Sequence, residues 1–416
     1  MRAKIDNPMR IFILSGTCGC DNLGDLAMLQ VALRRLKALW PDAAFRVLTD
    51  KPDELKIHCP EVEPVPWRGC KRWLHAGALP RFFFPDIRPE TRRRFPIIRK
   101  NLPSLARLLF PPDGRAAREF AGALFNSDLL VLSGSGMITD EFCLNALRML
   151  DTFEAAIRCG IPTAMLGQGL GPIRNEELFR RAARVLPRVR AIFIRERSAN
   201  LPLLQKLGVP GENIFITGDD AIEPAFHERP AAPGNCLGVN LRLAGYAALD
   251  AGILKTIRAP LAEKARQLGT TLAGIPILIG GRSSDVQTLR QLLGDVDAGN
   301  GLDTPLKIIR RISTCRAVVT GSYHAAVFAL AQGIPVVGIV QSAYYRDKFR
   351  GLADQFGGGC AVLPTDGGEF SGKLGMAIDK SWRQADALKP KLLAAAESQI
   401  AAAQTAYARL PGLVRR

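Results

Sequence analysis

The sequence lacks any long hydrophobic run. Its apolar stretches, such as residues 11–14 and 129–132, end far short of the roughly 18 residues that a membrane-spanning helix needs. The charged start, residues 1–10, is followed by no apolar block of the length found in signal peptides. We therefore expect a cytoplasmic protein with no membrane-spanning segment.

Patterned cysteines are lacking too. The nine cysteines include no CxxC pair, and Cys18 and Cys20, the closest two, fit no usual zinc spacing. We expect reduced, mostly buried thiols and no metal site. With 47% hydrophobic and 23% charged residues, the composition excludes a disordered or fibrous protein. A length of 416 residues favours two domains.

Positive charge is in excess, with 56 Lys and Arg against 39 Asp and Glu and a net charge of +17. Residues 66–118 hold 13 basic residues against three acids, interleaved with aromatics such as Trp67 and Phe95. Polyanions, anionic lipid surfaces and phosphorylated small molecules are compatible partners. This mixture suits a membrane headgroup interface, so we expect peripheral contact with the inner face of the membrane, with a plain insertion loop as the alternative. No recognised nucleic-acid module occupies the stretch, so no nucleic-acid partner is expected.

Short apolar runs alternate with helical periods along the chain. This βαβ rhythm predicts a doubly wound α/β protein with parallel sheets. A Pro-rich segment, residues 228–234, divides it into two Rossmann-like lobes facing across a cleft, over 1–228 and 236–388. The first lobe carries the basic insertion at about 54–120, and an Ala-rich helix over 389–416 packs back on it. Strands are predicted at residues 10–15, 45–48, 129–132, 163–166, 191–194, 237–241, 276–279, 317–319 and 335–340.

Three glycine-rich segments follow predicted strands of the first lobe. In the first, from Gly16 through Asn22 to Asp25, the following helix offers free N–H groups to an anion. It matches neither GxGxxG nor the Walker pattern, which disfavours dinucleotide or NTP binding; Asn22 and Asp25 either cap the helix or contact a ligand. The other two, residues 133–136 and residues 167–172 with Gln168, are predicted as turns on the same rim. Three such turns favour a ligand cleft.

A histidine motif follows a predicted strand of the second lobe. It runs Thr-Gly-Ser-Tyr-His from residue 320 to His324 at the start of a helix. The chain has only four histidines, and the other three stand in no ordered motif. His324 is therefore our catalytic candidate, with a satisfied structural histidine as the alternative.

Basic residues at strand ends are the candidates for binding an anion. Arg195 and Arg242 each follow a predicted strand directly, and Lys348 and Arg350 lie past the strand at 335–340. The forked donors of arginine suit carboxylate and phosphate groups at such positions. Solvated surface residues are the alternative for each.

Taken in order, these segments resemble the polysaccharide pyruvyl transferase family. The block from Gly16 to Asp25 resembles its opening motif, and residues 167–172 and 194–197 resemble central ones. Residues 321–325 with 333–337 resemble its C-terminal signature. The resemblance runs from about residue 10 to about residue 356 and is divergent at roughly 54–120.

The resemblance implies a GT-B-like fold and transfer of a pyruvyl group from phosphoenolpyruvate to sugar hydroxyls as a ketal. The acceptor would be a polysaccharide or its lipid-linked precursor, and no cofactor beyond this co-substrate is implied. By the same resemblance, His324 matches the essential histidine and Arg195 an arginine that holds the donor. Gly321, Ser322 and Tyr323 form the adjoining turn and are expected to bind substrate.

One position departs from the family pattern. The family commonly has arginine two residues before the histidine, where this chain has Ser322. Arg242 or Lys348 could supply the missing charge from another loop, or the donor could differ. A GT-B glycosyltransferase with a nucleotide-sugar donor is the alternative function.

Overall fold

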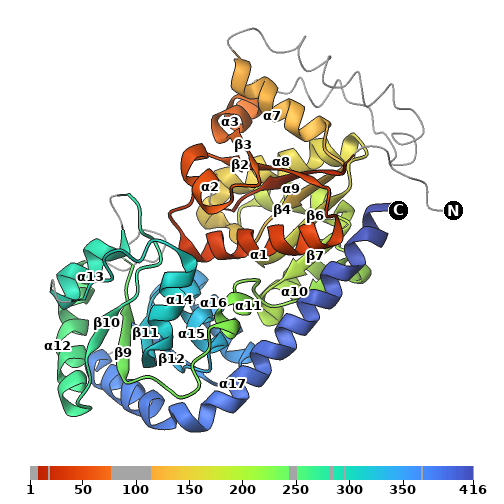
Figure 1. Ribbon diagram of the computed structural model, residues 1–416. Helices are drawn as coiled ribbons and strands as arrows, with labels where there is room; N and C mark the ends of the chain where they lie inside the picture. Colours follow the sequence, from red (N-terminus) through yellow and green to blue (C-terminus); the bar gives the residue numbers. More distant parts are fainter. Residues whose placement is uncertain are drawn as a thin grey trace.

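The chain folds into two α/β lobes, each built on a parallel sheet with helices packed around it (Figure 1). The computed structural model describes residues 8–16, 19–75, 114–242, 251–281, 284–294, 297–366 and 369–415. The predicted α/β class with two lobes is confirmed.

The first lobe holds an eight-stranded sheet in the order β3-β2-β1-β4-β6-β7-β8, with β5 beside β6. The strand order changes direction between β1 and β4, the kind of position where open α/β sheets bind ligands. The strands are β1 (Arg10–Leu14), β2 (Ala44–Thr49), β3 (Glu63–Pro66), β4 (Leu129–Leu132), β5 (Ser135–Ile138), β6 (Thr163–Leu170), β7 (Ala191–Ile194) and β8 (Ile214–Ile216).

The second lobe holds a five-stranded sheet in the order β10-β9-β11-β12-β13. Its direction changes between β9 and β11, so both sheets present a switch point at the carboxyl ends of their strands. The strands are β9 (Cys236–Asn240), β10 (Leu272–Gly274), β11 (Cys315–Thr320), β12 (Val336–Val340) and β13 (Cys360–Pro364).

Helices connect the strands, and many begin at a side-chain cap. Asn22, Asn175, Ser284, Thr304 and Ser342 each accept a hydrogen bond from a backbone N–H in the first turn. The helices are α1 (Leu23–Leu39), α2 (Pro52–His58), α3 (Trp67–His75), α7 (Arg115–Phe125), α8 (Cys143–Arg158), α9 (Glu176–Val185), α10 (Arg197–Lys206), α11 (Ile222–His227), α12 (Ala251–Gln267), α13 (Asp285–Leu293), α14 (Pro305–Ser313), α15 (Tyr323–Ala331), α16 (Ala343–Gln355) and α17 (Phe370–Arg415).

Two glycine-rich segments predicted as turns form strands instead. β5 begins at Ser135, and β6 continues through Gly167 to Leu170, so that the two strands pair beyond the point where turns were expected. The pairing of β6 with β7 shifts register between Met165 and Gln168, and Gly167 there adopts a φ of +56°. Glycine accommodates this irregularity within a strand, so its presence did not signal the end of β6.

The strand predicted at residues 276–279 is also wrong. The strand in that part of the sheet is β10, and residues 276–279 leave it to contact the first lobe. The N–H of Leu23 donates to the carbonyl of Ile277 at 2.9 Å, and the N–H of Ile279 donates to the carbonyl of Asp21 at 3.0 Å. The apolar pattern of this segment reflects burial between the lobes, which periodicity does not distinguish from burial in a sheet.

The two lobes share a hydrophobic core. One continuous cluster joins residues of β1 and α1 to residues of β9, β11 and β12, and a second covers the other face of the first sheet. α15 is buried at all nine of its residues. A helix that is hydrophobic all round is typical of such a central position. Its first turn is thereby fixed beside the first lobe.

Helix α17 crosses from the second lobe to the first (Figure 1). It begins at Phe370, and the helix expected from residue 389 is its C-terminal half. Pro390 lies within it, and the ammonium of the preceding Lys389 donates to the carbonyls of Pro230 and Ala231 in the interlobe linker, at 2.6 and 2.7 Å. One helix therefore contacts both lobes and the segment that joins them.

A buried polar network fastens the end of α17 to the first lobe. Arg35 of α1 pairs with Asp220 at 2.8 Å and with Glu223 at 2.5 Å, and its guanidinium lies over the ring of Tyr407. The hydroxyl of Tyr407 donates to Asp220 at 2.8 Å. Burial raises the pKa of the Asp220 carboxyl to about 6, although Arg35 opposes the shift. The buried carboxylate of Asp220 is therefore stabilised by both Arg35 and Tyr407.

The basic segment at 66–118 lies largely outside the described residues. At its base, α3 and α7 pack together, and the Trp67 side chain is only 8% exposed within the core of the first lobe. Trp67 is therefore not available to a membrane surface. Among the helices described, none is long and apolar enough to cross a bilayer.

We expect Tyr407→Phe to lower the free energy of unfolding by about 1.5–3 kcal/mol, because it removes a hydrogen bond to a buried carboxylate. Urea denaturation near neutral pH measures this. Gln404→Ala, an exposed change on the same helix, should stay within about 0.5 kcal/mol of the wild type. Equal stability of Tyr407→Phe and the control would contradict a fastening role for the network.

Candidate active site

A cavity of about 320 Å³ opens between the lobes at the carboxyl ends of both sheets. We call it the interlobe cavity. Its walls come from the start of α1, strand β5, the start of α8, the end of β7, the start of α15 and the first turns of α16. The residues that line it are Gly19, Asp21, Asn22, Asp25, Asp50, Gly136, Met137, Phe142, Asn145, Arg195, Arg242, Leu278, Ser322, Tyr323, His324, Tyr344, Tyr345 and Lys348.

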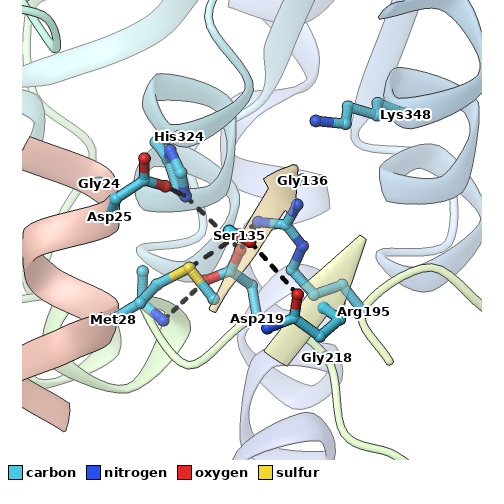
Figure 2. Close-up of polar contacts among 12 residues, drawn as sticks. Gly24, Asp25, Met28, Ser135, Gly136, Arg195, Gly218, Asp219, His324 and Lys348 are labelled. Atoms are coloured by element: carbon cyan, nitrogen blue, oxygen red, sulfur yellow. Dashed lines mark hydrogen bonds and ion pairs between the residues drawn. The ribbon is translucent and has the colours of Figure 1, made fainter. Parts of the chain in front are cut away.

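His324 stands at the start of α15 and faces the first lobe. Its Nε2 atom lies 3.8 Å from Asp25 Oδ1 and 3.7 Å from Asp219 Oδ2, and it makes no hydrogen bond in the described structure (Figure 2). Its ring packs against Gly24, where an added Cβ would come within 2.0 Å of the imidazole. Burial, reinforced by the charge of Arg195, lowers the pKa of His324 well below its usual value. The imidazole is therefore neutral, and its packing against Gly24 fixes its position.

Asp219 joins Arg195 to His324. Its Oδ2 atom accepts from Arg195 Nη1 at 2.9 Å, and its Oδ1 atom accepts from the N–H of Ala221 at 2.8 Å (Figure 2). Both side chains of the pair are 1% exposed. Burial raises the pKa of Asp219, and the guanidinium of Arg195 opposes that rise. The carboxylate thus holds the arginine while it faces the imidazole of the other lobe.

Lys348 extends from α16 into the interlobe cavity among tyrosine rings. Its ammonium donates to the hydroxyl of Tyr344 and lies 4.1 Å from the centre of that ring and 5.4 Å from the centre of Tyr323. Among the described residues it forms no ion pair, although the carboxylates of Glu196, Asp25 and Asp219 act on it from farther away. Burial, with the charge of Arg195, lowers the pKa of Lys348 to about 7. This cation is therefore the one whose charge is least compensated.

Two glycines make room for these cations. A Cβ at Gly136 would lie 2.5 Å from Lys348 Nζ and 3.3 Å from Arg195 Nη2, and a Cβ at Gly169 would lie 2.5 Å from Arg195 Nη2. These glycines belong to segments that the sequence marked as rim turns. Although those segments are strands, the first of them borders the cavity at Gly136, and residues 167–172 do not line it.

Arg242 supplies a third cation, from the residues after β9. Its guanidinium pairs with Asp285 through Nε at 3.0 Å and Nη2 at 3.1 Å. Ser322, which stands where the resemblance expects arginine, lines the same cavity. Cations from α16 and from the end of β9 therefore reach the space beside Ser322.

The structure brings most of the predicted site residues together, but not all of them. Asn22 lines the cavity and also caps α1, accepting from the N–H of Gly24 at 3.1 Å. Gly16 packs against Ser135, and Gly321 donates its N–H to the carbonyl of Asn240. Gln168 is fully buried and its amide donates to three backbone carbonyls, those of Leu132, Ser133 and Leu166. Gly16, Gly321 and Gln168 therefore do not line the cavity.

Sequence reasoning missed Asp219, Tyr344 and Tyr345. Asp219 follows β8 in the way that Arg195 follows β7, so the same rule of polar residues at strand ends would have found it had the short strand Ile214–Ile216 been recognised. The two tyrosines begin α16 after β12. No feature of the sequence marked them, because aromatic residues at a helix start are common in cores.

The arrangement combines cations that suit an anionic ligand with a neutral imidazole that can accept a proton. Asp25, beside that imidazole, has its pKa raised to about 6 by burial, with Arg195 opposing the rise. Among the described residues, no group of three or more His, Cys, Asp or Glu side chains is arranged to hold a metal ion.

Solved structures with the same two-lobed fold include sugar-nucleotide epimerases and glycosyltransferases. UDP-GlcNAc 2-epimerase from Neisseria meningitidis, bound to UDP-GlcNAc, has a TM-score of 0.56 and 12% identity, covering 98% of this chain and 100% of its own. UDP-GlcNAc 2-epimerase from Methanocaldococcus jannaschii has a TM-score of 0.51 and 12% identity, covering 90% and 93%. The glycotransferase of kitacinnamycin has a TM-score of 0.51 and 12% identity, covering 96% and 98%. These similarities establish the GT-B fold and nothing finer.

The sequence model described as polysaccharide pyruvyl transferase matches residues 22–342. The matched region contains Asp25, Arg195, Asp219 and His324 and ends before Lys348. No curated protein matches the sequence.

We expect the His324 imidazole to stay neutral down to about pH 6, because its pKa is lowered well below about 6.5. Histidine-selective NMR between about pH 8 and pH 6 measures this. The signal that disappears in His324→Gln identifies the residue. A midpoint near pH 6.5 for that signal would show that the imidazole is solvated and not enclosed as described.

Proposed function

Because the chain belongs to the polysaccharide pyruvyl transferase family, we propose that it transfers a pyruvyl group from phosphoenolpyruvate to hydroxyl groups of a sugar. The products are a ketal and inorganic phosphate. The proposal rests on one observation: Arg195, Arg242 and Lys348 line the same cavity between the lobes as the neutral His324. The sugar belongs to a polysaccharide or to its lipid-linked precursor.

Charge in the interlobe cavity supports an anionic donor. Phosphoenolpyruvate carries a phosphate and a carboxylate, and each needs hydrogen-bond donors or cations when it leaves water. Arg195 and Arg242 already have carboxylate partners, whereas Lys348 has a tyrosine hydroxyl only. Lys348 is therefore our first candidate for neutralising the donor, in place of the arginine absent at Ser322.

In the first step, a sugar hydroxyl adds across the carbon–carbon double bond of phosphoenolpyruvate. Its oxygen bonds to C2, its proton passes to the imidazole of His324, and the imidazolium delivers that proton to the methylene carbon, which becomes a methyl group. His324 is neutral before the step and neutral after it, which agrees with its lowered pKa. Arg195 and Lys348 hold the charge of the donor throughout.

In the second step, the bond between C2 and the phosphate oxygen breaks, and a second hydroxyl of the same sugar bonds to C2. The proton of that hydroxyl leaves with the phosphate. The carboxylate remains on the ketal, so the product carries one negative charge that the sugar did not have. Asp219 takes no proton in this scheme; it positions Arg195 against the imidazole.

Peripheral contact with the inner face of the membrane through the basic aromatic segment at 66–118 belongs to the same proposal. A lipid-linked acceptor would be presented there. Most of this segment, residues 76–113, lies outside the described structure.

We expect phosphoenolpyruvate to raise the unfolding temperature of the protein and UDP to leave it unchanged. His324→Gln should retain this stabilisation, because the cations remain, and should lose about 10²–10⁴ in the rate of phosphate release, the usual contribution of one acid–base group. Thermal unfolding and a phosphate assay measure the two effects. Stabilisation by UDP alone would favour the nucleotide-sugar alternative, and full turnover by His324→Gln would remove the imidazole from the mechanism.

We expect donor affinity to fall as the pH rises above about 7, because Lys348 has a pKa of about 7 and loses its charge there. Each further pH unit should raise Kd for phosphoenolpyruvate by up to about tenfold, until the pKa of Lys348 in the complex is reached. In Lys348→Arg the guanidinium stays charged, so the slope between about pH 7 and pH 9 should vanish. Calorimetric titration across that range distinguishes the two, and parallel slopes would exclude Lys348 as the titrating group.

A further inference from the structure

A second cavity, of about 520 Å³, opens beside the interlobe cavity, between the first lobe and helix α16 of the second lobe. We call it the side groove. The segment after the middle of β6, residues 169–174, forms one wall, and the first turn of α10 and the exposed face of α16 form the others. Asn200 fixes this wall, since its amide exchanges hydrogen bonds with the backbone N–H and carbonyl of Leu170 at 3.1 and 3.3 Å.

The side groove meets the interlobe cavity at Tyr344 and Lys348, which line both. Consecutive residues at the end of β7 also divide between them: Arg195 lines the interlobe cavity, and Glu196 lines the side groove. Between the two side chains stands Gly169, where an added Cβ would lie 2.5 Å from Arg195 Nη2 and 3.2 Å from Glu196 Oε2. The two spaces are therefore separated only by a glycine backbone and by the Tyr344–Lys348 pair.

Glu196 holds an unsatisfied oxygen at this junction. Its side chain is 1% exposed, and its Oε1 atom accepts no hydrogen bond of ordinary length; Arg195 Nε lies 3.7 Å away, and the carboxylate also acts on the hydroxyl of Tyr323, whose pKa is raised by burial and by this carboxylate. A buried carboxylate oxygen without a well-placed donor costs free energy. A hydroxyl of a ligand seated at the inner end of the groove would supply the donor.

The charges of the side groove balance. Three basic residues, Arg174, Arg350 and Lys348, and three acids, Glu196, Asp347 and Asp354, line it, four of them on α16. A net anionic ligand would gain little there, in contrast to the interlobe cavity. Alternating donors and acceptors beside the apolar surfaces of Pro172 and Leu203 suit a ring with many hydroxyls and no charge.

We propose that the side groove binds the acceptor as an uncharged sugar, with Glu196 accepting a hydrogen bond from a hydroxyl at the end nearest the interlobe cavity. The inference rests on the proposed pyruvyl transfer and adds where and how the acceptor binds. The sugar enters from outside the first lobe, and its reacting hydroxyls pass Tyr344 toward the donor. Donor and acceptor thus occupy separate spaces that meet at Lys348.

Ser198→Trp tests the groove, because Ser198 is exposed on the first turn of α10 and lines it. Gln205→Trp places the same side chain on the exposed, opposite end of α10, away from both cavities, and serves as the matched control. The probes are phosphoenolpyruvate and a panel of p-nitrophenyl glucosides, galactosides, mannosides and N-acetylglucosaminides. Phosphate release gives KM for each substrate, and thermal unfolding reports donor binding independently of any acceptor.

We expect Ser198→Trp to raise KM for the active glycoside by at least about tenfold, with KM for phosphoenolpyruvate and the donor-induced stabilisation unchanged within about twofold. Gln205→Trp should match the wild type in all three. An unchanged KM for the glycoside in Ser198→Trp would overturn the proposal. So would loss of donor stabilisation in Ser198→Trp alone, or a wild type that binds the donor and responds to no glycoside. Failure of phosphoenolpyruvate to stabilise the wild type would instead overturn the proposed function.

Discussion

The carboxylate of Asp219 is the contact on which the interlobe cavity depends. Arg195 and Asp219 are both withdrawn from water, and neither charge would be tolerated there alone, because an uncompensated buried ion costs several kcal/mol. The pair fixes the guanidinium at the end of β7, and the same oxygen faces His324 of the second lobe. One buried anion thus sets the relative positions of a cation and an imidazole that come from different lobes. The packing of α15 within the shared core supplies the matching constraint from the other side.

The same burial gives the neighbouring groups their chemistry. It lowers the pKa of both His324 and Lys348 and raises that of Asp25, each time because the charged form loses hydration. The positive charge of Arg195 strengthens the shifts at His324 and Lys348 and opposes the one at Asp25. An anion that enters the cavity has the opposite effect and raises the pKa of both His324 and Lys348. The cavity is therefore arranged to change its protonation when an anion binds.

The architecture could be predicted from the sequence because it rests on local patterns. Fully apolar runs such as Leu129–Leu132 are buried parallel strands, and residues 285–293 form the expected helix. Charged residues at strand ends, Arg195 and Arg242, reach the cavity for the reason that predicted them. The failures have separate causes: burial between lobes or around irregular strands leaves no distinct period, and a very short strand gives too little sequence to recognise. Residues 276–279 resemble a strand because they are buried, and Asp219 escaped notice because β8 is only three residues long.

Helix α17 has a consequence for how the lobes can move. It is anchored on the first lobe by Tyr407, packs on the second along its beginning, and holds the connecting segment through Lys389. Any rotation of one lobe against the other must therefore bend helix α17. Proline in a helix interior removes one backbone hydrogen bond and weakens the helix locally. Pro390 follows Lys389, whose ammonium contacts the interlobe linker. A bend of α17 therefore meets least resistance next to the segment that joins the lobes.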